Sequence, residues 1–270
     1  PTQSSTVAVN EEASLADTIK EFLSDTKYRI RLDDLASNQL RSLLYDIREA
    51  HFPLNSPPVT PNEFARRLRA IEELMVEVET LVCLVSRWGK REHLEVLQKV
   101  IIHLARNADK INGNIVWLRL YWYPVLRAMY CGGISALVSG NYEFLRILLA
   151  TPIESQRYSG RKPIVLPAAD GILDIDREQM FKALPGHSRF FVPRSEYLLG
   201  SIQPVAEDLF FLGSEYETLF DRFEIMYALV YADLTEDANG YVWGPPGRFC
   251  WKGRRGGGPF EELFNEASAE

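Results

Sequence analysis

Cationic and aromatic residues gather near the carboxy-terminal end of this 270-residue chain, whose net charge is -7. The segment GRFCWKGRRGGG combines four basic side chains with aromatic rings and glycines. Guanidinium groups bind phosphate or carboxylate in a bidentate manner, and aromatic rings stack on bases or on a partner's side chains. We therefore predict a binding site for a protein partner or a small phosphorylated ligand at Arg248, Trp251, Lys252, Arg254 and Arg255. The alternative is a solvated loop beside an acidic helix.

A second candidate site is the segment PGHSRFFVPRSEYLL, in which Arg189 and Arg194 flank an aromatic turn that leads into a predicted helix. The amino-terminal end of a helix favours anions, so this arrangement could bind a nucleotide or another phosphorylated molecule. The alternative is a turn between helices that Phe190 and Phe191 pin to the core.

The motifs of the commonest enzymes are missing from the sequence. It contains no glycine-rich phosphate loop, dinucleotide fingerprint, paired-histidine zinc helix or nucleophile elbow. His93 and His103 are ten positions apart, which puts them on different faces of one predicted helix. The apolar neighbours of Cys131 indicate a buried, inert thiol. We predict no catalytic residue, metal or cofactor and favour a protein that is not an enzyme, with a site assembled from scattered residues left open.

The centre of the chain is an apolar and aromatic run over residues 116–138 that carries only Arg119 and Arg127 as charges. Its length would suffice to span a bilayer. Two arginines, Pro124 and a Gly-Gly pair make a span costly, and amphipathic segments on both sides can cover the run. We predict the buried centre of a helical domain, with one helix over 115–137 that is bent at Pro124 or loosened at the glycines.

Apolar residues at spacings of three and four predict the other elements. A capping box at Thr60 to Glu63 with Pro61 opens one helix, and Ser214 with Glu217 forms a second box. The segment 142–150 should pair with the central helix as an αα-hairpin of the solenoid type, and residues 241–253 should form a β-hairpin. The predicted helices begin near residue 14 and cover 32–47, 61–87, 91–108, 115–137, 142–150, 176–184, 194–211 and 214–234, with a last short helix over 259–267.

The predicted fold class is therefore all-α, an irregular multi-helix bundle with one αα-hairpin resembling a solenoid unit and a small carboxy-terminal β-hairpin. We expect a disordered arm over residues 1–11 and a single helical domain over 12–268, with a loop-rich insert at 151–193. At 46% hydrophobic residues the chain can bury a large core without disulfides or metals.

Composition also limits the partners and the compartment. The negative net charge argues against bulk binding to nucleic acid and to anionic membranes. Three cysteines in apolar surroundings and a polar, small-residue start without a secretion signal indicate a cytoplasmic protein.

The segments WLRLYWYPVLRAMYCGGISALVSGNYEFLRILLATP, FDRFEIMYALVYADL and GPPGRFCWK, with the early RIRLDDLASNQL, resemble a helical carboxy-terminal region of bacterial multidomain conflict and phage-defence proteins. There the region follows a Schlafen-like, sirtuin-type or TIR-type effector. The resemblance covers most of the chain, rests on apolar helices and transfers no catalytic residue. It implies a sensing, scaffolding or oligomerising part whose partner is an amino-terminal effector module.

Two hypotheses about function result. The first is a non-catalytic interaction, sensor or scaffolding domain that uses the carboxy-terminal patch to contact a protein partner, with a homo-oligomer as a further possibility. The second is a nucleotide-binding enzyme or regulatory subunit with a site near Arg189 and Arg194.

Overall fold

The computed structural model describes residues 15–235, 242–253 and 257–269 of the chain. Among the described residues up to 150, helices are the only regular elements. Residues 15–24 form the first helix, and a proline-rich connection precedes the longest helix, in which the Thr60 hydroxyl accepts a hydrogen bond from the backbone N–H of Glu63 as the sequence predicts. The elements that follow the first helix are η1 (Thr26–Tyr28), α2 (Arg29–Asp46), α3 (Pro61–Trp88), η2 (Arg91–His93), α4 (Leu94–Ala108), α5 (Ile115–Leu120), α6 (Tyr123–Val138) and α7 (Tyr142–Ala150).

The second half contains the only strands among the described residues. They form one antiparallel pair in which Ile153 lies opposite Lys162. The elements are β1 (Pro152–Glu154), β2 (Arg161–Pro163), α8 (Val165–Arg177), α9 (Pro193–Phe210), α10 (Glu215–Asp233), α11 (Phe249–Lys252) and α12 (Pro259–Ala269). The all-α class with a small hairpin is confirmed.

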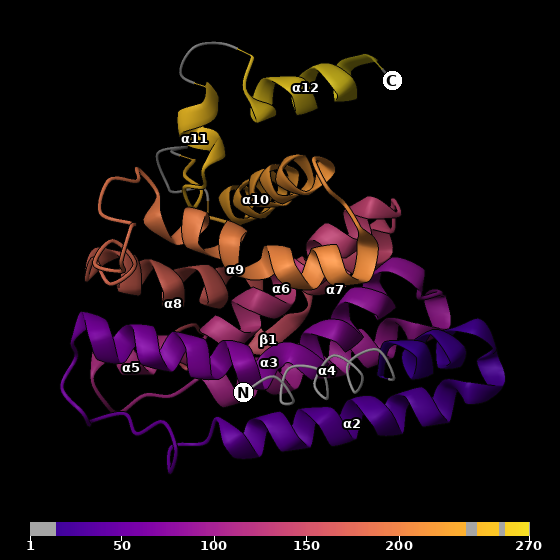
Figure 1. The fold of residues 1–270 in the computed structure, drawn as a ribbon, viewed down its shortest axis with the longest axis horizontal. Coiled ribbons are helices and arrows are strands. Elements are labelled where there is room, and N and C mark those ends of the chain that lie inside the picture. Colours follow the sequence, from indigo (N-terminus) through magenta and orange to yellow (C-terminus); the bar gives the residue numbers. More distant parts are fainter. Residues whose placement is uncertain (1–14, 236–241, 254–256, 270) are drawn as a thin grey trace, which may run out of the picture.

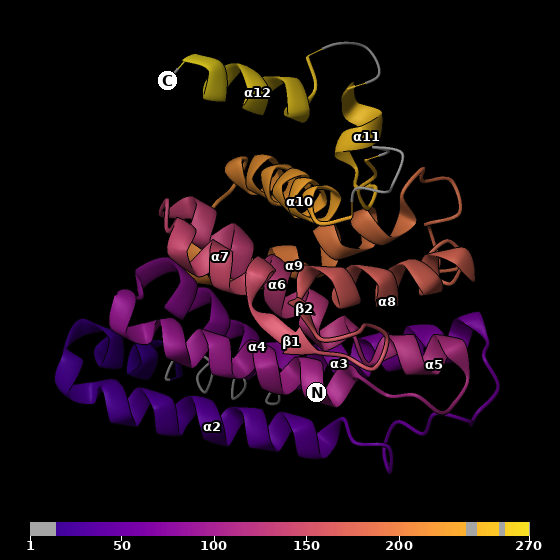
Figure 2. The same cartoon turned by 180° about the vertical axis from the view of Figure 1, so that it is seen from behind.

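The helices are stacked in layers from α2 at one end of the molecule to α12 at the other (Figures 1 and 2). Helices α3, α4 and α5 follow α2, and α6, α7, α8 and α9 form the middle of the stack. Helix α10 lies between this middle layer and the carboxy-terminal helices α11 and α12. The carboxy-terminal segment is therefore an outer layer that touches the core through α9 and α10.

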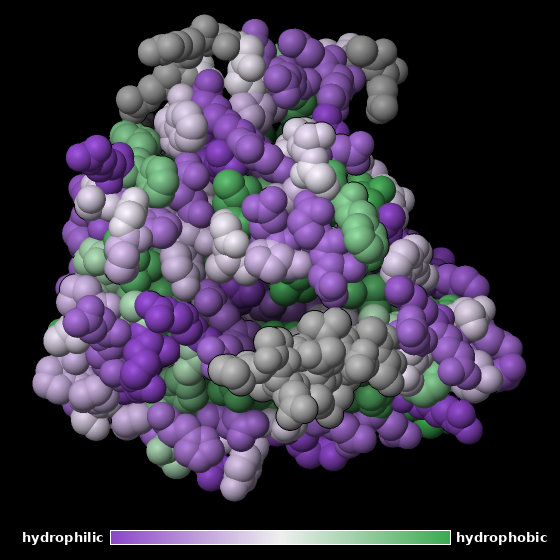
Figure 3. Space-filling model, in the orientation of Figure 1, coloured by the Kyte–Doolittle hydropathy of each residue, from purple (hydrophilic) through white to green (hydrophobic). Residues whose placement is uncertain are grey.

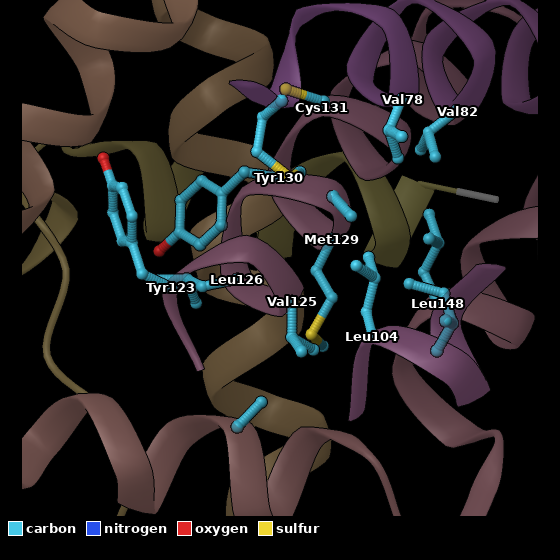
Figure 4. Packing of buried hydrophobic residues seen from close by; sticks show 14 of the residues in the cluster. Val78, Val82, Leu104, Tyr123, Val125, Leu126, Met129, Tyr130, Cys131 and Leu148 are labelled. Atoms are coloured by element: carbon cyan, nitrogen blue, oxygen red, sulfur yellow. The ribbon is translucent and has the colours of Figure 1, made fainter. Parts of the chain in front are cut away.

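Helix α6 is the centre of the core, because every residue from Tyr123 to Ala136 is buried. It contacts α3, α4, α7, α8, α9 and α10. Figure 4 shows α6 side chains such as Met129 surrounded by those of α3, α4 and α7, including Val82, Leu104 and Leu148. A helix that is apolar on all sides must be enclosed on all sides, and here neighbouring helices enclose it.

The central run divides earlier than the sequence predicts. Helix α5 ends at Leu120, and α6 begins at Tyr123 with Pro124 in its first turn. A proline inside a continuous helix would lack its hydrogen bond and clash with the carbonyl four residues earlier, so the chain turns at Tyr121 and Trp122 instead. The prediction of one bent helix over 115–137 is wrong.

The glycine pair lies within the regular helix α6 and permits close contacts with three neighbouring helices. A Cβ atom on Gly132 would lie 2.7 Å from Val82 in α3 and 2.8 Å from Leu148 in α7. A Cβ atom on Gly133 would lie 2.0 Å from the ring of Phe223 in α10. The contact with α7 belongs to the predicted αα-hairpin, which the structure contains.

Two further local predictions are wrong. Residues 242–248 form no regular element and lead directly into α11, so the described part of the predicted carboxy-terminal hairpin contains no strand. Pro245 and Pro246 explain this, since neither has an N–H to donate to a ladder. The segment 151–193 also contains a helix that the sequence did not predict, α8, and most of its residues are buried. The helix predicted over 176–184 is absent, because α8 already ends at Arg177. The arm predicted over residues 1–11 lies outside the described residues.

The two charges of the central run are paired inside the protein. Nη2 of Arg127 donates to Glu79 Oε2 at 3.0 Å, and its Nη1 donates to Glu72 Oε1 at 3.2 Å. Nε of Arg119 donates to Asp174 Oδ2 at 2.8 Å. These partners come from α3 and α8, so the arginines that argue against a membrane span also link α5 and α6 to their neighbours.

On the one face of the molecule that Figure 3 shows, hydrophobic patches are interspersed among hydrophilic residues. In residues 15–235, 242–253 and 257–269, we find no helix with both the length and the apolar character that crossing a bilayer requires.

We predict that Gly133→Ala destabilises the protein by about 1–3 kcal/mol, because the added methyl group would overlap the Phe223 ring in a packed core. The matched control is Gly200→Ala in α9, where no atom lies within 4 Å of the new Cβ. Its better helix propensity should stabilise the protein by about 1 kcal/mol. Urea denaturation measures both effects, and equal changes in the two variants would contradict the close contact between α6 and α10.

Candidate functional site

The carboxy-terminal patch lies against α9 and α10, where its cations meet carboxylates. Arg248 is 5% exposed, and its Nη2 donates to Glu217 Oε1 at 2.9 Å. Its Nε lies 3.6 Å from Glu196 Oε1 and 3.7 Å from Asp221 Oδ1. Nζ of Lys252 pairs with both Glu217 and Asp221. We call these five residues the C-terminal ion cluster.

The cluster neutralises the cations that the sequence offers for binding. Three carboxylates surround two cations, so the cluster carries no excess positive charge. Trp251 on α11 is 38% exposed, and its Nε1 donates to Glu196 Oε1 at 3.0 Å. These contacts hold the segment on the helices, while a direct role of Arg248, Trp251 and Lys252 in binding stays a prediction. Arg254 and Arg255 lie outside the described residues.

Glu224 lies beneath the cluster and is buried in α10. Its Oε1 accepts a hydrogen bond from the Tyr130 hydroxyl at 2.9 Å, and its Oε2 accepts one from the Ser195 hydroxyl at 2.7 Å. The backbone N–H of Arg248 donates to the same Oε2 at 3.0 Å. Burial raises the pKa of Glu224 to about 7, and the hydrogen bond from Ser195 and the nearby Arg194 charge oppose that rise. This carboxyl group therefore joins α6, α9 and the carboxy-terminal segment.

A glycine is required where the segment passes over Glu224. A Cβ atom on Gly247 would lie 2.4 Å from Glu224 Oε2, and one on Gly244 would lie 2.7 Å from the Ala228 carbonyl oxygen. The close approach lets the N–H of Arg248 reach the carboxylate. The glycines of GPPG thus serve backbone contact rather than the hairpin turn that we predicted.

The second predicted site adjoins the first. Arg194 is buried at the start of α9, where its Nε donates to Asp176 Oδ2 at 2.9 Å and its Nη2 donates to the Pro246 carbonyl oxygen at 3.1 Å. Arg189 is exposed on the turn that precedes α9. Arg194 therefore contacts the same segment that contains Arg248. From the sequence we predicted two separate sites at these residues.

Sequence reasoning missed the acidic partners, although one signal points to them. Glu217, Asp221 and Glu224 are four and three positions apart, which places them on one face of α10. Three acids on one side of a helix, two of them among apolar neighbours, indicate a cationic partner within the protein. Asp176 and Ser195 carry no such signal, because their spacing along the chain gives no hint of their contact.

No group of three or more histidine, cysteine or acidic residues that could hold a metal ion occurs among the described residues. Cys83 and Cys131 are buried, and the Cys83 thiol donates to the Cys131 carbonyl oxygen at 3.7 Å. A hydrogen bond with Cys83, followed by burial, raises the pKa of the Cys131 thiol.

We predict that Glu224→Gln weakens the pH dependence of stability. The folded-state pKa of about 7 exceeds the ordinary value of 4.5, so the folded protein binds more protons than the unfolded chain between these values. The wild type should lose stability as the pH rises from about 4.5 to 7, by roughly 3 kcal/mol at 1.36 kcal/mol per pKa unit. Gln does not ionise, and its Oε1 can accept from Ser195 and the Arg248 N–H while its amide group donates to the Tyr130 hydroxyl oxygen.

Chemical denaturation from pH 4.5 to 8 measures the slope, with Glu143→Gln, which alters an exposed side chain of α7, as the control. The control should retain the wild-type slope. An unchanged slope in Glu224→Gln would show that Glu224 does not titrate in this range.

We predict that Arg248→Gln costs about 3–5 kcal/mol, because it leaves Glu217, Asp221 and Glu196 without their central cation. Limited proteolysis should then cleave the segment around 242–253 faster. Arg189→Gln, on the exposed turn, should change stability by less than about 0.5 kcal/mol. Equal stability of the two variants would contradict a structural role for Arg248 and would favour a role in ligand binding alone.

Comparison of the chain with protein-family models, with curated proteins and with solved structures yields no match. The resemblance to carboxy-terminal regions of defence proteins therefore stays a prediction. What the chain does has to be argued from its own surfaces and contacts.

Proposed function

We propose that this chain is a non-catalytic protein-interaction domain and that α12 is the element its partner recognises. The observation that carries the proposal is the exposure of two aromatic side chains on α12. Phe260 is 48% exposed and Phe264 is 65% exposed. They are four positions apart, so they share one face of the helix.

The attachment of α12 to the rest of the protein supports this proposal. The helix packs on α10, and the ion pair between Arg222 and Glu266 joins the two at partly exposed side chains. Leu263 is only half-buried. An 11-residue helix is marginal in water unless its apolar face is covered, so a partner that covers Phe260 and Phe264 would stabilise it.

Charge indicates the chemistry of the partner surface. Glu261 flanks the two phenylalanines on α12, whereas Glu262 and Glu266 lie on the opposite face of the helix, where Glu266 pairs with Arg222 of α10. An apolar groove with basic residues along its rim would complement this helix, in the way that amphipathic helices dock by anchors at i and i+4. Trp251 on α11 and Trp243, whose ring contacts Tyr231 of α10, are further exposed aromatic side chains in the carboxy-terminal part of the chain.

The C-terminal ion cluster supports a structural role for Arg248 and Lys252, which is to hold the carboxy-terminal helices in place. Because Arg248 and Lys252 are paired within the protein, they can present α11 and α12 in a defined position. An effector module on the amino-terminal side, a separate protein or a second copy of this chain could each supply the groove. We favour a different protein with a basic rim, since two copies of α12 would bring like charges together.

The test is site-specific cross-linking followed by a binding measurement. A photo-reactive residue at position 264 should cross-link a protein in cells that make this chain, and the same residue at exposed Tyr142 should not. Calorimetry with the purified partner should then show that Phe260→Ser with Phe264→Ser weakens binding at least tenfold at an unchanged melting temperature.

Tyr142→Ser, which alters a side chain of 61% exposure on α7, is the control and should bind like the wild type. Equal cross-linking from positions 264 and 142, or full affinity of the double variant, would refute the proposal. A cross-linked homodimer would refute the proposal that the partner is a different protein with a basic rim, and would show that α12 contacts a second copy of this chain.

A further inference from the structure

A cavity of about 390 Å³ opens beside the second predicted site. It lies between the end of α8, the turn segment 178–192 and the carboxy-terminal segment. Asp176, Lys182, Phe190, Phe191 and Pro246 are among its lining residues. Its volume falls within the range of small-molecule sites, about 300–1,000 Å³.

The aromatic part of the lining is exposed and can take a flat ring. Phe190 is 41% exposed and Phe191 is 61% exposed, while Phe181 at the same cavity is buried. Large rings at the surface of a concave site favour stacking with planar ligands. Gln179 on the same wall has a left-handed φ of 58°, and its Nε2 donates to the Asp176 carbonyl oxygen at 3.0 Å. Such conformations persist where the surrounding contacts enforce them, often at ligand sites.

The polar part of the lining offers one acceptor and one cation. Oδ2 of Asp176 is bound to Nε of Arg194 at 2.9 Å, while no hydrogen bond reaches Oδ1 from the rest of the described chain. The carboxylate is 26% exposed, so Oδ1 can accept from an N–H group of a ligand. Arg194 balances the charge of Asp176, which leaves Lys182 as the unbalanced charge among the described lining residues.

We propose that this cavity binds a planar heteroaromatic molecule that carries an N–H donor and one anionic group, the chemistry of a nucleoside monophosphate. Phe190 and Phe191 contact the ring, Asp176 accepts the ring or exocyclic N–H, and Lys182 pairs with the anion. The inference is independent of the interaction through α12.

Isothermal titration calorimetry with the full chain in phosphate-free buffer tests this proposal. The probes are AMP, GMP, CMP and UMP. Two part-ligands accompany them: adenosine, which lacks the phosphate, and ribose 5-phosphate, which lacks the base. We expect at least one nucleotide to bind, and both part-ligands to bind at least tenfold more weakly.

Two variants and their controls locate the site. Lys182→Glu and Phe191→Ala should each weaken the bound nucleotide at least tenfold, whereas Lys20→Glu on the first helix and Tyr142→Ala, at the same 61% exposure as Phe191, should not. Circular dichroism checks that all four variants are folded. Absence of binding by all four nucleotides, adenosine binding as tight as AMP, or wild-type affinity in Lys182→Glu would each overturn the proposal.

Discussion

The enclosure of α6 is the constraint on which the rest of this structure depends. A helix that is buried along its whole length from Tyr123 to Ala136 exposes apolar surface in every direction unless helices cover it on every side. Six neighbouring helices do so, and the glycine pair lets them approach closely in two directions. The buried pair of Arg127 and Glu79 fixes the position of α6 along α3, since breaking such a pair leaves an uncompensated charge.

The polar layer around Glu224 connects this core to the outer helices. One carboxyl group receives hydrogen bonds from α6, from α9 and from the backbone of the carboxy-terminal segment. The adjoining C-terminal ion cluster and the contact of Arg194 with the Pro246 carbonyl oxygen hold the same segment. Both proposed functional regions adjoin this anchored segment, because Pro246 lines the cavity beside Asp176 and α12 follows the segment along the chain.

Periodicity predicted the fold class, most helices and the burial of the central run, because these depend on the local distribution of apolar side chains. It failed where long-range contacts decide. Pro124 starts a helix instead of bending one, and Ser214 makes no capping hydrogen bond although Glu217 follows at the right spacing. Glu217 contacts Arg248 and Lys252 instead, which are over thirty positions away. The cationic residues of the site were visible in the sequence, but their acidic partners on α10 were not recognised, because pairing across the fold leaves only a weak spacing signal.

Gly132 contacts α3 and α7, and Gly133 contacts α10. These contacts restrict which insertions and deletions the α6 segment can accept. Inserting or deleting one codon between Arg127 and Gly132 would turn each glycine by about 100° relative to the arginine. If Arg127 still faced Glu79 after such a change, residues larger than glycine would lie against Val82 and Phe223, where no room exists for them. Length variation among descendants of this sequence should accordingly be confined to connections between helices, such as the proline-rich stretch before α3, and be excluded from α6.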